Sequence, residues 1–190
     1  MTPGDGFFDQ LLGGTDPAVV REAADRAATL LVRGARESGD PAVADRILQL
    51  AEEEGIETIA EVWSGAPADT LAGCLWRLFL LRSWVYADPV GVAREYDAGR
   101  ARAQLARVVA GVADPPGPDE LRTMIDEVLR GIAGSDFADV LLRAAAFARV
   151  VAAGRAALRP ADTGPEARHM LQLSEQLETA GHLELEHRLG

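Results

Sequence analysis

Apolar residues recur along most of this chain at spacings of three and four, the period of an amphipathic helix. No segment combines two-residue alternation with β-branched residues, and the nearest case, LELEHRL at 183–189, fits a helix equally well. Asp-Pro pairs precede several of the apolar patterns, and glycines follow several of them, as expected for helix starts and ends. The pattern predicts helices over 17–38, 41–54, 57–63, 67–87, 89–111, 119–132, 136–158 and 165–180.

These helices predict an all-α protein, an irregular bundle of about seven to eight helices. HEAT-like stacking of helix pairs is an alternative, because ARVVA occurs twice at a separation typical of two-helix repeats. We expect an N-terminal arm over 1–15 and a helical domain over 16–158. The breaker ADPPGP makes 113–118 a candidate subdomain boundary, and 159–190 forms a linker, an amphipathic helix and a tail.

Charge and composition narrow the class of protein. The formal net charge is −11, and the arginines are spread along the chain, so direct binding to nucleic acid is not expected. The longest apolar run near the middle of the chain is far too short to span a membrane. The first residues lack the features of a signal peptide, and the single cysteine cannot form an internal disulfide. We therefore expect a cytoplasmic protein without a membrane partner.

The stretch LAGCLWRLFLLRSWVYADP (71–89) places Arg77 and Arg82 among apolar residues. On a helix the two side chains point about 140° apart, so they do not form one patch. An enclosed guanidinium needs an anionic partner. Carboxylates that could neutralise the two arginines stand on both sides of the stretch: Glu57, Glu61, Asp69 and Asp88. The arginines are interpreted as structural ion pairs or, with Glu61 and Asp69, as an anionic-ligand site.

Other candidate chemistry is weaker. Cys74 lies on an apolar helix about a hundred residues from any histidine, which favours a buried, inert side chain over a nucleophile. The segment EYDAGRAR (95–102) and two Glu-x-x-His pairs, Glu166 with His169 and Glu184 with His187, are interpreted as solvated polar faces. The chain has no phosphate-binding, hydrolase or calcium-loop motif. No metal ion or cofactor is expected.

Two apolar segments near the ends of the chain resemble docking elements. The first contains Phe7, Phe8, Leu11 and Leu12, and the second contains Met170, Leu173 and Leu177. Each segment either packs on its own bundle or binds a groove of a partner protein or of a second copy of this chain.

Four blocks, LWRLFLLRSWVYADP, REYDAGRA, VVAGVADPPGP and RAAAFARVVAAGRAAL, resemble an uncharacterised family of small all-helical actinobacterial proteins, over roughly residues 16–158. Members of that family sometimes carry the label RNA polymerase β subunit. This chain lacks the size and the metal-binding aspartate motif of that enzyme. The resemblance therefore implies a transcription-linked partner at most, and it assigns no functional residue.

The leading prediction is a non-enzymatic cytoplasmic module for protein interaction or scaffolding, with a protein partner or a second copy of itself. The alternative is a small anionic-ligand binder, or an unfamiliar enzyme, that uses Arg77 and Arg82 with nearby carboxylates in an interhelical pocket.

Overall fold

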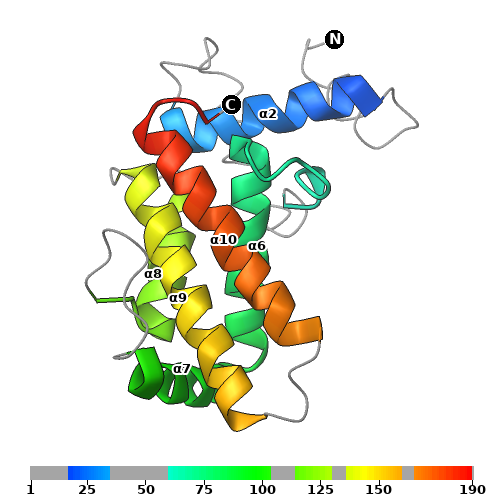
Figure 1. Cartoon of the computed structure of the whole chain (residues 1–190). Helices are drawn as coiled ribbons and strands as arrows, with labels where there is room; N and C mark the ends of the chain where they lie inside the picture. The colour runs from blue at the N-terminus through cyan, green and yellow to red at the C-terminus, as the bar shows by residue number, and fades with distance from the viewer. Residues whose placement is uncertain (1–16, 35–59, 104–113, 130–135, 160–164, 190) are drawn as a thin grey trace.

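The computed structural model describes residues 17–34, 60–103, 114–129, 136–159 and 165–189. Regular secondary structure in these ranges is helical, which confirms the all-α prediction. The predicted arm 1–15 and the predicted helix 41–54 lie outside the described residues. The helices in the described ranges are α2 (Pro17–Arg33), α6 (Leu71–Ala87), α7 (Pro89–Ala103), α8 (Pro118–Leu129), α9 (Phe137–Leu158) and α10 (Pro165–Leu185) (Figure 1).

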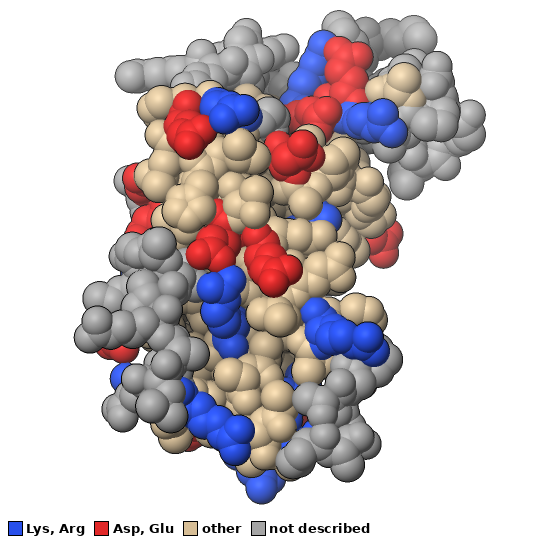
Figure 2. All heavy atoms as spheres, in the orientation of Figure 1, with Lys and Arg blue, Asp and Glu red and all other residues tan. Residues whose placement is uncertain are grey.

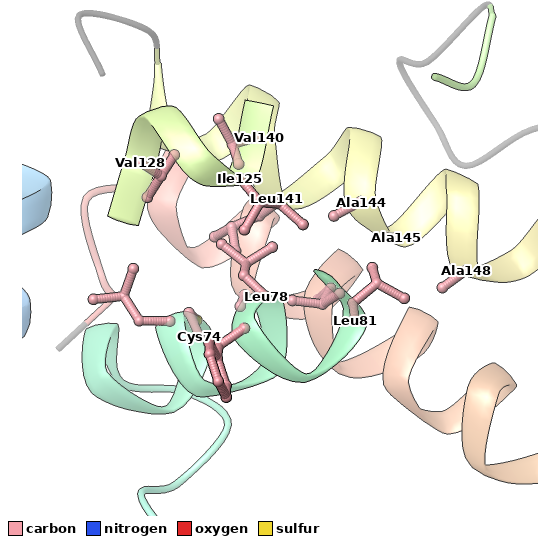
Figure 3. Close-up of a cluster of buried hydrophobic side chains, with 14 of the residues drawn as sticks. Cys74, Leu78, Leu81, Ile125, Val128, Val140, Leu141, Ala144, Ala145 and Ala148 are labelled. Carbon is pink, nitrogen blue, oxygen red and sulfur yellow. The ribbon is translucent and has the colours of Figure 1, made fainter. Parts of the chain in front are cut away.

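Helix α9 is the centre of the bundle. It contacts α6, α7, α8 and α10, whereas a helix in a solenoid repeat contacts only its neighbours along the stack. In Figure 1, α10 crosses in front, α7 lies across the bottom and α2 lies across the top. Figure 3 shows apolar side chains of α6, α8 and α9 meeting in one core. The described helices therefore form an irregular bundle.

Two glycines bring α7 and α9 unusually close together. A Cβ on Gly154 would lie 1.7 Å from the carbonyl oxygen of Glu95, and one on Gly99 would lie 1.9 Å from that of Val150. Any larger residue would overlap the facing backbone, so the crossing depends on the missing side chains. Beside this crossing, Tyr96 of α7 stacks on Phe147 of α9 with ring centroids 5.5 Å apart.

Helix α6 begins at Leu71, four residues later than the predicted start at Pro67. Its N-cap is Thr70, whose hydroxyl oxygen accepts a hydrogen bond from the amide of Gly73 at 3.0 Å. Threonine supplies an acceptor for an otherwise unpaired amide at the helix start, and proline offers no such side chain.

Two other helix ends also differ from the prediction. Helix α2 ends at Arg33 and not at 38, because Gly34 adopts a positive φ of 78°. Helix α10 continues to Leu185 and not to 180. Gly181 stays helical because Leu142 of α9 packs directly on it, where a Cβ would lie 2.8 Å from the Leu142 side chain. The predicted end at Gly181 is therefore wrong.

The helical pattern breaks at 114–117, immediately before α8, as the proline-rich segment predicted. Side chains from both sides of the break, such as Tyr96 and Ile125, belong to the same core. Among the described residues, no helix has the length and apolar character needed to cross a membrane.

Candidate functional site

The two arginines singled out in the sequence have different partners. Arg82 donates from Nε to a carboxylate oxygen of Asp126 on α8, and its guanidinium lies 4.5 Å from the ring centre of Tyr86. The Tyr86 hydroxyl donates to the second oxygen of Asp126 at 2.9 Å. Arg82 is thus neutralised inside the fold, as the ion-pair interpretation expects, although its partner was not among the predicted carboxylates.

Arg77 has no such neutralisation. Its Nε donates to the amide oxygen of Gln176 at 2.9 Å, and its Nη1 donates to the carbonyls of Gly73 at 2.8 Å and Ala66 at 3.4 Å. All three acceptors are uncharged. Each of the other partly buried arginines that the structure describes has a carboxylate partner: Arg33, Arg82, Arg122, Arg143, Arg149 and Arg155. Arg77 is therefore an oriented cation without a counterion among the described residues.

The carboxylates predicted to face these arginines lie elsewhere. Glu61 and Asp69 are exposed, and neither forms an ion pair with Arg77 or Arg82. Asp88 accepts a hydrogen bond from the amide of Gly91 at 2.9 Å, at the start of α7. Glu57 lies outside the described residues. The structure therefore does not bring Arg77, Arg82, Glu61 and Asp69 together into one site.

Arg77 lines an open groove between α6 and the first half of α10, with a volume of about 450 Å³. We call it the α6–α10 groove. Its walls are mainly apolar and aromatic, and the residues that form them are Trp76, Leu80, Trp84, Met170 and Leu173. Its other charged or titratable lining residues are Arg155, Glu166 and His169. The groove combines a fixed cation with a surface suited to apolar side chains.

Arg155 adds little net charge to this groove. It contacts both carboxylate oxygens of the buried Glu95 at 3.0 to 3.2 Å, and it also lies 4.0 Å from Glu166. Its guanidinium carbon lies 5.1 Å from the ring centre of Trp84, so the ion pair fixes one wall of the groove. Because Arg155 is already paired with Glu95, the lining leaves one positive charge, that of Arg77, and one negative charge, that of the exposed Glu166.

The predicted docking residues of the C-terminal helix lie at different depths. Met170 and Leu173 line the α6–α10 groove, but Met170 is only 8% exposed and belongs, with the 0% exposed Leu177, to the core of its own chain. The N-terminal candidates Phe7, Phe8, Leu11 and Leu12 lie outside the described residues. Two docking residues and one candidate arginine, predicted separately, thus meet in one groove.

Burial raises the pKa of the Cys74 thiol to about 12, and the nearby Arg77 guanidinium only partly opposes this shift. The thiol is therefore protonated at neutral pH, which agrees with the prediction of an inert side chain. Within the described ranges, no three His, Cys, Asp or Glu residues are grouped so that they could hold a metal ion.

Two segments interpreted as solvated faces contain buried acids, so those interpretations are wrong in part. In EYDAGRAR, Glu95 is 6% exposed and pairs with Arg155, and Tyr96 is 4% exposed. In the second Glu-x-x-His pair, Glu184 is 5% exposed and accepts hydrogen bonds from both terminal nitrogens of Arg33. Both carboxylates are buried because arginines from distant helices neutralise them.

Sequence reasoning missed several groove residues. A lone glutamine in a polar helix has no distinctive pattern, so the sequence gives no signal for Gln176. Trp76 and Trp84 are eight residues apart, which is about two helical turns, so both lie on one side of a helix. That spacing was the signal in the sequence that could have placed both tryptophans in one groove wall.

Comparisons with protein-family models, with curated proteins and with solved structures find no match to this chain. The resemblance to an actinobacterial family stays a prediction.

Proposed function

We propose that this protein is a non-enzymatic helical module that binds an apolar segment of a protein in the α6–α10 groove, with an acidic group of that segment against Arg77. The observation that carries the proposal is the state of Arg77, which is partly buried, held by uncharged acceptors and not neutralised by a carboxylate of the described residues. A cytoplasmic location belongs to the same proposal and is supported by the free, buried Cys74.

The hydrogen bonds of Arg77 prepare it to bind an anion. They fix Nε and Nη1, while Nη2 forms no hydrogen bond with the described residues. An incoming carboxylate can accept from Nη2 without displacing an internal ion pair. Charge-assisted hydrogen bonds of this kind are roughly twice as strong as neutral ones.

The groove walls support a protein segment as the occupant. Trp76, Trp84 and Leu173, which are partly exposed, offer apolar contacts beside the cation. Tryptophan and arginine are the residues most enriched at the energetic centres of protein interfaces. Leu80, at 42% exposed, is a further apolar residue of the groove wall that is open to an occupant.

Selection of a displayed peptide library on the full-length protein tests this proposal. We expect enriched peptides to combine leucine or aromatic residues with Asp or Glu. A synthetic peptide from that set should change tryptophan emission, because Trp76 and Trp84 line the groove and the third tryptophan, Trp63, is 0% exposed.

Arg77→Ala should weaken binding of that peptide at least about tenfold, which corresponds to the loss of one charge-assisted hydrogen bond. The matched control is Arg168→Ala, which removes the same charge from an exposed position of α10 outside the groove lining. Equal loss in both variants, or enriched peptides without acidic residues, would overturn the proposal.

A small anionic molecule is the second candidate occupant. The groove volume of about 450 Å³ falls within the range of small-molecule sites, which is the observation in its favour. A thermal-shift screen of anionic metabolites tests it. A saturable shift that Arg77→Ala abolishes and Arg82→Ala preserves would favour this candidate, since Arg82 is already paired with Asp126.

A further inference from the structure

The positive and the negative charge of the α6–α10 groove lie at its opposite ends. At one end, Arg77 of α6 donates to Gln176 of α10. At the other end, Arg155 lies over the ring of Trp84 of α6 and 4.0 Å from Glu166 of α10. The two helices therefore run antiparallel along the groove. Glu166 precedes Gln176 by about three turns of α10, so the two charges are about 15 Å apart along the helix axis.

Apolar side chains line the groove together with these two charges. Those that are at least partly exposed are Trp76, Leu80, Trp84 and Leu173. In the space-filling view, acidic and basic side chains are separated by uncharged areas, and neither sign forms a continuous patch over the visible face (Figure 2). An occupant of the groove is therefore recognised by two separate charges with apolar contacts, and not by a broad charged surface.

The Arg77 end is prepared for a single carboxylate. Gln176 accepts from Arg77 through Oε1, and its amide nitrogen forms no hydrogen bond with the described residues, so it is a second donor beside Nη2 of Arg77. Asp69 and Glu175 line a separate hollow next to Gln176, and neither pairs with Arg77. One carboxylate can thus bind at this end, whereas a further acidic group beyond it would approach Asp69 and Glu175.

The walls of the groove favour a helix as the occupant. Both walls are helices, whose backbone groups are bonded within each helix, so the groove offers no strand edge with which an extended peptide could pair. An extended backbone against apolar walls would leave polar groups without partners, whereas a helix satisfies them internally. Amphipathic helices bind grooves of this kind through apolar residues at spacings of three and four.

We propose that the segment bound in the α6–α10 groove is an amphipathic helix that runs antiparallel to α10, with an acidic residue in its first turn against Arg77 and a basic residue about ten positions later against Glu166. This inference rests on the proposed function, because it specifies the partner of the same groove. The direction is the one that the helix dipole favours, with the acid near the amino end and the base near the carboxyl end.

The peptides selected on the full-length protein test the spacing of the two charges. We expect enriched peptides to carry Lys or Arg about ten positions after the acidic residue, with apolar residues between them at helical spacing. Exchanging the acid and the base of the best peptide should weaken its binding at least about tenfold, because like charges then meet at both ends of the groove. A proline at the centre of the peptide should abolish binding.

Charge reversal at Glu166 tests the second contact. Glu166→Arg should weaken the selected peptide about threefold or more, a modest effect because the carboxylate is exposed. The same peptide with its basic residue changed to Glu should bind Glu166→Arg protein more tightly than it binds the wild type, and this recovery shows that the variant is folded. Glu127→Arg, at an exposed carboxylate of α8 outside the groove lining, is the matched control and should change neither affinity.

A spin label on the peptide tests its direction, because a nitroxide quenches tryptophan emission at short range. Trp76 adjoins Arg77, and Trp84 lies at the Glu166 end of the groove. A label at the amino end of the bound peptide should quench Trp84→Phe protein more strongly than Trp76→Phe protein. A label at the carboxyl end should have the opposite effect. Reversal of both results would overturn the proposed direction.

Three further results would overturn the inference: enriched peptides with an acid but no base at this spacing, binding that a central proline leaves unchanged, or equal effects of Glu166→Arg and Glu127→Arg. In each case, peptides that bind through Arg77 would leave the proposed function standing without this partner. A selection that enriches no peptide would overturn both.

Discussion

At the scale of single residues, the interior of this bundle is organised by arginines and the groups that accept from them. Arg155 with Glu95 and Arg33 with Glu184 join helices that are distant in sequence, and their carboxylates are almost fully buried. Burying a charge costs several kcal/mol unless a partner neutralises it. These pairs therefore fix which helices meet, whereas Arg77 is held by uncharged acceptors among the described residues.

Replacing Glu95 with alanine should lower the free energy of unfolding by about 3–5 kcal/mol, because the buried Arg155 would keep only the exposed Glu166, 4.0 Å away, as an anionic partner. Urea denaturation followed by circular dichroism measures the change. The matched control is Glu22→Ala, which removes one member of an exposed pair with Arg26 and should cost at most about 1 kcal/mol. Equal small effects would contradict a buried, mutually dependent pair.

The raised pKa of Cys74 predicts its reactivity. Thiol reagents attack the thiolate, and with a pKa of about 12 the protonated form dominates well above neutral pH. We expect no reaction with a disulfide reagent at pH 8 in the native protein and full reaction in denaturant. Mass spectrometry of the labelled chain detects the difference. Rapid native labelling would show that the thiol is accessible.

At the scale of helices, the contact between α7 and α9 depends on Gly99 and Gly154. Glycine in a helix interior costs about 1 kcal/mol relative to alanine, so local preference alone favours replacing both. The close approach of the facing carbonyl groups outweighs this preference. The geometry of the crossing, and with it the position of Arg155 beside Trp84, follows from the absent side chains.

Gly154→Ala should therefore destabilise the protein by about 1–3 kcal/mol, although the same change stabilises an isolated helix. The added Cβ would overlap the Glu95 carbonyl, so α7 must move away. Gly117→Ala is the control, because nothing lies within 4 Å of the added Cβ there. Thermal unfolding of the two variants gives the comparison. A more stable Gly154→Ala protein would mean that the helices adjust freely.

At the scale of the whole molecule, α10 is an integral part of the bundle and not a detachable tail. The Ser174 hydroxyl donates to the carbonyl of Ala145 on α9 at 2.8 Å, and Glu184 pairs with Arg33 on α2. Leu177 is enclosed between these contacts. One face of α10 thus belongs to the core, and another lines the α6–α10 groove.

Leu177→Ala should cost about 2–5 kcal/mol, the usual effect of opening a cavity at a buried leucine. Leu185→Ala on the same helix should cost less than about 0.5 kcal/mol, since that side chain is 53% exposed. Both values come from urea denaturation at several protein concentrations. A Leu177 effect that depends on protein concentration would indicate packing in trans and would contradict the arrangement within one chain.

The sequence by itself determined the secondary structure of the described residues, because helix periodicity and end signals act between residues within a few positions. It located α8 and α9 closely and identified the break before α8. It also singled out Arg77, Met170 and Leu173, although not that they share a groove. The end of α10 was missed because a distant side chain, Leu142, packs on Gly181. The start of α6 and the end of α2 were missed although Thr70 and Gly34, which decide them, are local signals.

Only the tertiary structure decided which charges are neutralised. Arg82 pairs with Asp126, and Arg77 binds Gln176 of α10, a residue that no local pattern linked to it. Glu95 and Glu184 sit in segments that look solvated, yet both are buried against distant arginines. Periodicity describes one helix at a time, whereas burial and ion pairing depend on how the helices pack. Arg77 lacks a carboxylate partner among the described residues because of how the helices pack. The proposed function rests on this feature of the packed bundle.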